Sequence, residues 1–142
     1  MLFKRKNKDN NQECNPAEKI SVFDLDWHIT EGYGSIKREG NRQYREEEFS
    51  ETIVAYLVGD PQLNQEGRFF NFKTDKKYKT LEFTIWAESG SDDLTVFVHD
   101  VMIDVTRKPT VYTIDISRYK EIGIYFDIEK DAKIIVADPV VY

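Results

Sequence analysis

The chain has 142 residues, of which 40% are hydrophobic, 13% aromatic and 32% charged, and its formal net charge is -6. This composition is too apolar and too aromatic for a disordered chain, and the length is typical of one domain. Because no basic stripe offsets the negative charge, the sequence argues against a nucleic acid as the partner.

The cysteine count and the apolar runs constrain the compartment. The single cysteine, Cys14, excludes an internal disulfide, so the fold does not depend on an oxidising environment. No apolar run approaches the roughly 20 residues that a membrane-spanning helix needs. The basic start MLFKRKNKDNNQEC is not followed by the apolar segment of a secretory signal. As written, the sequence predicts a cytoplasmic protein; a fragment of a longer secreted protein would instead be extracellular or on the cell surface.

The first residues differ from the rest of the chain. Residues 1–19 are polar, charged and rich in asparagine, without apolar periodicity, which predicts a flexible or disordered tail. We expect residues 20–142 to form a single domain. Cys14 lies in the tail with no histidine near it in sequence to activate it, so it is not expected to be a nucleophile.

The first half of the domain mixes strand and turn signals. Trp27 belongs to a short apolar stretch that enters a glycine-containing turn at residues 32–34. The charged residues 37–49 resemble a turn. Residues 50–58 fit a helix or a strand, and their β-branched side chains favour a strand, which Pro61 keeps from continuing.

The second half carries the clearest pattern. Residues 67–75 predict a strand closed by a turn at 75–77. In residues 78–87, apolar side chains alternate with a mixed face, which is typical of a half-buried antiparallel strand. The apolar face holds Leu81, Phe83 and Ile85, and the mixed face holds Glu82, Thr84 and Trp86.

Further alternating segments follow to the end of the chain. They are residues 95–99, 101–105, 109–116, 122–128, 133–137 and 140–142. The whole domain then has about eight strands at regular spacing and no convincing helix. This pattern predicts an all-β fold, an antiparallel β-sandwich or jelly roll.

Several short motifs resemble the NPCBM family of carbohydrate-binding modules. The resemblance covers roughly residues 27–142, and its motifs are specific for the fold rather than for a ligand. They are SETIVAYL at 50–57, KYKTL at 77–81, VFVHD at 96–100, Pro109 with IDIS at 114–117, IGI at 122–124 and VADP at 136–139. The resemblance implies a galactose-binding-like jelly roll with a non-catalytic recognition role.

Aromatic side chains are the candidate ligand contacts. Sugar rings stack their C–H faces on exposed aromatic rings, with polar groups nearby to fix orientation. Trp86 lies opposite the apolar face of its strand, so it is expected to be exposed and is the first candidate. Tyr125 follows, because it opposes Ile124 and Phe126. Further candidates are Trp27, Tyr56 and Tyr33, although aromatic residues are enriched in strands for packing alone.

The acidic turn at residues 88–93 has two interpretations. Asp92 and Asp93 could contribute to a calcium site, but such a site needs several converging oxygen ligands. A hairpin connection with glycine supplying a positive φ is the simpler interpretation. We expect no other metal and no cofactor.

Catalytic signatures are absent from the sequence. Neighbouring carboxylates occur at Asp24 and Asp26 and at residues 46–48, as expected by chance in an acidic protein. His28 and His99 are the only histidines, and neither has a recognisable nucleophile beside it. The sequence therefore predicts a non-catalytic recognition module, and the family resemblance implies a carbohydrate as its ligand. The alternative is an intracellular protein-interaction or assembly module, for example of a phage or mobile element.

Overall fold

The computed structural model describes residues 18–30, 34–57, 69–90, 94–126 and 132–142. These residues form thirteen strands and one three-residue 3-10 turn, η1 (Val22–Asp24), and all strand pairings are antiparallel. The predicted all-β class is confirmed, whereas about eight strands is too low a number. The predicted tail lies outside the described residues except for its last two positions.

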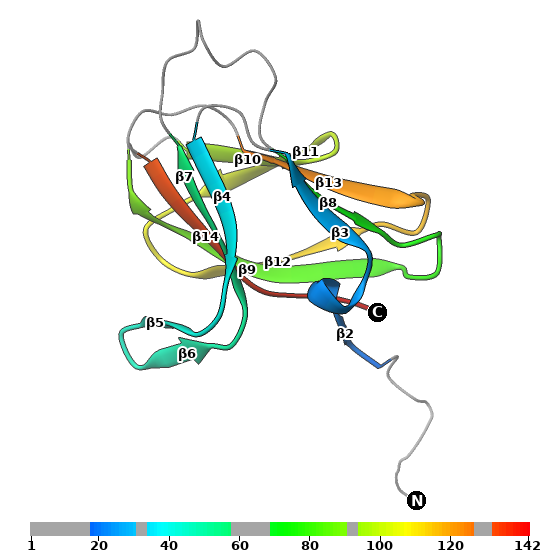
Figure 1. The fold of residues 1–142 in the computed structure, drawn as a ribbon, viewed down its shortest axis with the longest axis horizontal. Helices are drawn as coiled ribbons and strands as arrows, with labels where there is room; N and C mark the ends of the chain where they lie inside the picture. The colour runs from blue at the N-terminus through cyan, green and yellow to red at the C-terminus, as the bar shows by residue number, and fades with distance from the viewer. Residues whose placement is uncertain (1–17, 31–33, 58–68, 91–93, 127–131) are drawn as a thin grey trace, which may run out of the picture.

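The strands form two sheets that pack face to face (Figure 1). The five-stranded sheet has the order β11 (Val101–Val105), β10 (Leu94–Val98), β13 (Glu121–Phe126), β8 (Phe69–Lys73) and β3 (Trp27–Thr30). The six-stranded sheet has the order β12 (Thr110–Asp115), β9 (Thr80–Ser89), β14 (Ala132–Val141), β7 (Thr52–Leu57) and β4 (Gly34–Glu39), and β2 (Ile20–Ser21) also pairs with β14. A separate hairpin consists of β5 (Arg42–Tyr44) and β6 (Glu47–Phe49).

The core fills the space between the sheets, and two-residue alternation supplies it. Each strand turns one set of side chains inward and the next set outward. On β9 the inward side chains are Leu81, Phe83 and Ile85, each at most 1% exposed, as the sequence predicts. On β13 they are Ile122, Ile124 and Phe126, all fully buried. From β7 to β10 the chain alternates between the two sheets, so neighbouring segments contribute to both halves of this core.

Strands β4, β5 and β6 occupy the charged stretch that resembles a turn in sequence. β4 is an edge strand that pairs with β7 along its whole length, and most of its described side chains are exposed. Backbone pairing therefore holds it, with little apolar alternation to reveal it. The same stretch also forms the β5–β6 hairpin, which packs on the outer face of the six-stranded sheet.

The C-terminal strand contains a bulge. β14 is one strand across the two predicted segments, and its register with β9 shifts between Ala137 and Val140. Asp138 has φ 47 there, and Pro139 falls at the bulge, where a central strand tolerates proline. The Asp138 carboxylate accepts hydrogen bonds from the backbone N–H groups of Ser50 (3.0 Å) and Glu51 (2.9 Å), which fixes the entry to β7.

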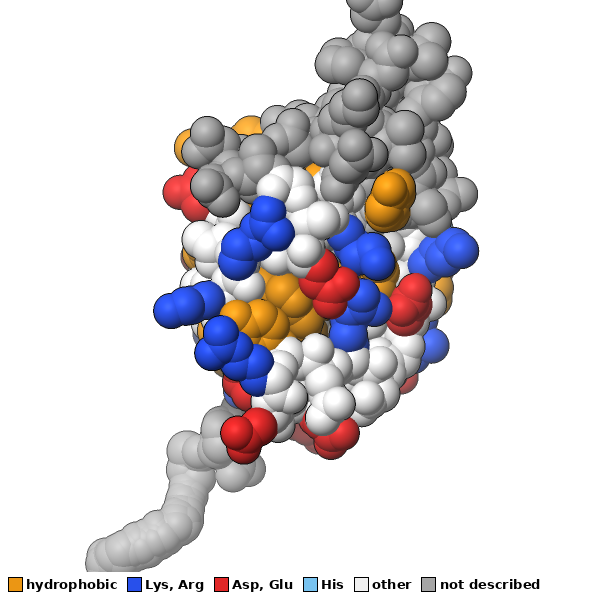
Figure 2. Space-filling model, turned by 90° about the vertical axis from the view of Figure 1, so that its left-hand side faces the viewer, with side chains coloured by type: hydrophobic (Ala, Val, Ile, Leu, Met, Phe, Trp, Pro, Cys, Tyr) orange, Lys and Arg blue, Asp and Glu red, His pale blue; other side chains and the backbone are white. Residues whose placement is uncertain are grey.

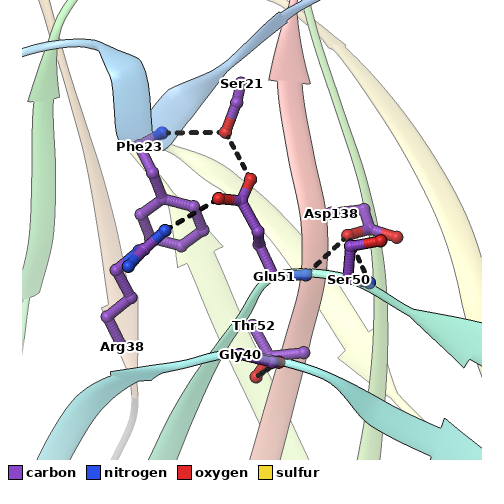
Figure 3. Close-up of polar contacts among 8 residues, drawn as sticks. All are labelled: Ser21, Phe23, Arg38, Gly40, Ser50, Glu51, Thr52 and Asp138. Carbon is purple, nitrogen blue, oxygen red and sulfur yellow. Dashed lines mark hydrogen bonds and ion pairs between the residues drawn. The ribbon is translucent and has the colours of Figure 1, made fainter.

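A polar network fastens the N-terminal segment to the six-stranded sheet (Figure 3). The Ser21 hydroxyl donates to Glu51 Oε1 (2.8 Å) and accepts from the N–H of Phe23 (3.2 Å). Arg38 Nη2 donates to Glu51 Oε2 (2.7 Å), and its guanidinium lies 4.6 Å from the centre of the Phe23 ring. These contacts join β2, η1 and β4 to Glu51, the residue that precedes β7.

Candidate functional site

Trp86, the first candidate from the sequence, is buried. Its side chain is 1% exposed, although it does lie on the face of β9 that points away from the main core. A second apolar cluster encloses it there. The cluster consists of Phe49, Val54, Trp86, Ile135 and Ala137, with Tyr44 packed against it. The predicted exposure of Trp86 is therefore wrong, because the β5–β6 hairpin covers this face.

Ring contacts and an ion pair close the hairpin over Trp86. The rings of Phe49 and Tyr44 lie 5.1 Å and 5.9 Å from its ring. Arg42 donates to both carboxylate oxygens of Glu88, at 2.9 Å from Nε and 2.5 Å from Nη2. This hydrogen bonding lowers the pKa of Glu88 and raises the pKa of Arg42, and partial burial opposes both shifts. The ion pair between Arg42 and Glu88 thus stabilises the packing of the hairpin over Trp86 at neutral pH.

The side of the molecule that carries this hairpin has charges of both signs around an apolar area (Figure 2). Arg107 donates to the backbone carbonyls of Glu88 (3.1 Å) and Gly90. A hollow of about 330 Å³ remains, lined by Tyr44, Trp86, Ala87, Glu88 and Arg107. Glu88 already binds Arg42, and Arg107 already binds backbone carbonyls. The charged side chains of this hollow are therefore engaged within the protein.

The other aromatic candidates lie apart from one another. Trp27 is half-buried on the core side of β3, with its ring 5.8 Å from Phe23 and 5.7 Å from Phe70. Tyr56 is 41% exposed on the outer face of the six-stranded sheet, opposite Lys133. Tyr33 lies outside the described residues. Trp27 therefore packs against the core, and Tyr56 is exposed on a different sheet from Tyr125.

Tyr125 lies on the outer face of the five-stranded sheet. Its neighbour across the ladder is Phe97 of β10, and the two ring centroids are 6.3 Å apart. Both side chains are partly exposed. Met102 of β11 is paired with Phe97 on the other side and is 62% exposed. An apolar row thus crosses three neighbouring strands.

A hollow of about 270 Å³ adjoins this row. Its lining residues are Asn71, His99, Glu121, Gly123 and Tyr125. Gly123 is paired with Asn71 of β8, and its carbonyl accepts from the N–H of His99 (3.2 Å). A glycine inside a strand weakens it, and such a position often marks a bulge, a bend, or the close approach of a ligand or of another backbone. Gly123 here provides a floor without a side chain, between an aromatic ring and three polar side chains.

Two imidazoles flank the hollow and are held in place. His99 lies in the turn between β10 and β11 with φ 54, and its ring stacks on Tyr119 at 4.1 Å. Its Nε2 is 3.0 Å from the carbonyl of Glu121, so Nε2 donates and Nδ1 of a neutral ring is an acceptor. His28 Nε2 lies 3.4 Å from Nδ2 of Asn71. The His99 ring and the Asn71 amide thus each have a contact within the protein that orients them.

A larger hollow, of about 420 Å³, lies at the β9–β12 edge. It is lined by Lys79, Thr80, Thr113, Ile114, Asp115 and Ser117. The hydrogen bond from the Ser117 backbone N–H, with a second from its hydroxyl, lowers the pKa of Asp115. No aromatic ring is among the described residues that line it, so it offers no stacking surface.

The structure does not test the possible calcium site in the acidic turn. Asp92 and Asp93 lie outside the described residues. Within the described residues no group of three or more histidine, cysteine or acidic side chains could hold a metal ion. Over the same residues no helix has the length and apolarity to cross a membrane.

The sequence selects Tyr125 as a candidate contact, but it does not select the residues that line the hollow with it. Asn71, Glu121 and Gly123 come from two strands, and only the β8–β13 register brings them together. Phe97 could have been found, because it opposes two buried valines in the same alternation that singled out Tyr125. His99 is considered in the sequence only in connection with catalysis, and no sequence pattern predicts that it lines a hollow.

Comparison with known proteins supports the fold. No protein-family model and no curated protein sequence matches this chain, so membership of the NPCBM family stays a prediction. The chain is similar over 87% of its length to a structure of Clostridium perfringens ZmpB that contains the M60 catalytic domain with the CBM51-1 and CBM51-2 domains. The TM-score is 0.60 at 15% identity, and the match spans 15% of that longer chain.

Two structures of a family 11 carbohydrate-binding module from Clostridium thermocellum are also similar. Each has a TM-score of 0.48 and 10% identity over 87% of this chain, and the matches span 93% and 92% of their chains. One of them holds a β-1,3-1,4-mixed-linked tetrasaccharide. The chain has a β-sandwich fold like that of carbohydrate-binding modules, which is the coarser part of the sequence prediction.

Proposed function

We propose that this protein is a non-catalytic carbohydrate-binding module and that the hollow over Gly123 holds the sugar. The observation that carries the proposal is the aromatic ring of Tyr125 beside Asn71, His99 and Glu121 above a glycine floor. A sugar presents an apolar face to an aromatic ring and hydroxyls to polar side chains, so this arrangement matches both halves of its surface. The β-sandwich fold supports the same function.

The hollow has the composition of a binding site rather than a hydrolytic one. Glycoside hydrolysis ordinarily uses two carboxylates on opposite sides of the bond that breaks. Glu121 is the only carboxylate among the described residues that line the hollow. We therefore assign Glu121 the role of a hydrogen-bond acceptor for sugar hydroxyls.

The protein-interaction alternative calls for a contiguous apolar surface. Among the described residues, the large exposed apolar side chains are Tyr56, Val101, Met102 and Val111. Tyr56 and Val111 belong to the six-stranded sheet, and Val101 and Met102 belong to β11. The contiguous row of Tyr125, Phe97 and Met102 adjoins the polar side chains of the hollow, and this mixture favours the carbohydrate proposal.

A glycan-array screen of the purified full-length protein, followed by calorimetric titration of the best glycan, tests the proposal. Tyr125→Ala should weaken binding about tenfold or more, because it removes the stacking ring. Gly123→Val should abolish binding while the strand stays folded, because valine suits a strand and fills the floor. Tyr56→Ala is the matched control, a tyrosine exposed on the other sheet, and should bind as the unmodified protein does.

Two results would contradict the proposal. A blank array with a protein folded by circular dichroism would remove the carbohydrate function. Loss of binding in Tyr56→Ala but not in Tyr125→Ala would place the site on the six-stranded sheet instead.

A further inference from the structure

The hollow over Gly123 is smaller than the surface that surrounds it. Its volume of about 270 Å³ lies below the usual range for pockets that enclose a drug-sized ligand, roughly 300–1,000 Å³. A single sugar unit is therefore the most that it can enclose. On the outer face of the five-stranded sheet, further exposed side chains extend from the hollow across the strands in both directions. They are apolar in one direction and polar in the other.

On one side the continuation is apolar. The register places Tyr125, Phe97 and Met102 in one row on β13, β10 and β11. Met102 is 62% exposed on the edge strand, and a flexible apolar side chain of this kind is common at binding surfaces. A bound ligand that extends from the hollow in this direction contacts Phe97 first and then Met102.

On the other side the continuation is polar. Gly123 pairs with Asn71, and Asn71 pairs with His28 on the edge strand β3. Asn71 Nδ2 lies 3.4 Å from His28 Nε2, so the amide and the imidazole are neighbours on this face of the sheet. If a bound ligand extends from the hollow in this direction, its hydroxyl groups can form hydrogen bonds with Asn71 and His28.

We infer that the outer face of the five-stranded sheet binds an internal segment of an unbranched, neutral glycan chain that lies across the strands from His28 to Met102. This inference rests on the proposed function and specifies its ligand class. Five adjacent strands at about 4.8 Å spacing give a path of roughly 19 Å, which is longer than one sugar unit. Both ends of the path lie on edge strands with exposed side chains, so neither end stops a chain among the described residues.

The charges of the path favour a neutral chain. The described residues that line the hollow include no lysine or arginine. Lys73, the nearest cation by register, lies opposite Glu121 and 3.7 Å from the Asp26 carboxylate. Glu121 and Asp104 add exposed carboxylates to this face, which would repel an acidic sugar.

The test is the dependence of affinity on chain length. Titration calorimetry would use linear mono-, di-, tetra- and hexasaccharides of glucose, galactose, xylose and N-acetylglucosamine with the full-length protein. In at least one series the affinity should rise about tenfold or more from the monosaccharide to the hexasaccharide. Met102→Ala should lower the affinity for the hexasaccharide about threefold and leave the monosaccharide unchanged. Val111→Ala is the matched control, since Val111 is 60% exposed on the other sheet.

The outcomes separate the chain inference from the proposed function. A glycan-array hit on a terminal or branched sugar, with no gain along any series, would overturn the inference and leave the function standing. An equal loss from Met102→Ala for all lengths, or from Val111→Ala, would also overturn it. A blank array together with blank titrations would overturn both.

Discussion

At the scale of single residues, the Arg42–Glu88 pair makes closure of the hairpin over Trp86 sensitive to acid. The hydrogen bond from Arg42 lowers the pKa of Glu88, and a weaker hydrogen bond from Trp86 acts in the same direction. A carboxyl whose pKa is lower in the folded protein stabilises the fold above its unfolded pKa of about 4.3 and loses that effect as the pH falls through the folded value. Glu88→Gln should therefore lower the free energy of unfolding by up to about 1 kcal/mol near pH 7 and by less near pH 3.

Urea denaturation of both proteins at the two pH values measures this difference. Glu48→Gln is the matched control, because Glu48 is an exposed glutamate of the same hairpin. An equal loss of stability at both pH values would show that the charge of Glu88 contributes nothing to the closure.

At the scale of elements, the bulge in β14 organises the start of β7. Asp138 combines a positive φ with two accepted hydrogen bonds and donates its own N–H to the carbonyl of Glu51 (2.7 Å). Asp138→Ala should cost about 1–3 kcal/mol of unfolding free energy, because alanine strains at this φ and leaves two N–H groups without their acceptor. Asp138→Asn keeps an acceptor oxygen and tolerates the left-handed conformation, so it should cost less than about 1 kcal/mol. Thermal and urea unfolding would compare the two; equal losses would contradict the acceptor role.

The elements also show how far the sequence could predict this fold. β9, β10 and β13 follow from alternation, because one face of each lies on the core. β4 does not, since it is held by backbone pairing with β7. Alternation correctly placed Trp86 on the outer face of β9, but it cannot say what covers a face. The covering hairpin precedes Trp86 by about 40 residues in the chain, and its packing is a long-range contact.

The candidate site has the same limit. Tyr125 could be predicted because its own strand assigns it to the outer face. The hollow could not, because its polar side chains come from β8, the β10–β11 turn and β13 and meet only through strand order. Strand order is a property of the whole sheet, and no local pattern in a single sequence encodes it.

At the scale of the whole molecule, the shared core predicts that both sheets unfold together. The chain has two tryptophans, and each reports on a different sheet. Trp27 packs on Phe70 beside the five-stranded sheet, and Trp86 packs on Phe49 outside the six-stranded sheet. Trp27→Phe leaves a reporter for the six-stranded sheet, and Trp86→Phe leaves one for the five-stranded sheet.

In each variant, urea unfolding followed by tryptophan fluorescence should coincide with unfolding followed by far-ultraviolet circular dichroism. The two variants can differ in stability from one another, so the comparison is made between probes within each variant. The reason is structural: inward side chains of both sheets form one apolar cluster, and exposing one sheet removes the partner surface of the other. If fluorescence and circular dichroism gave separate midpoints in either variant, the sheets would be distinct cooperative units. The outer face that carries the proposed glycan path could then lose its shape before the rest of the molecule unfolds.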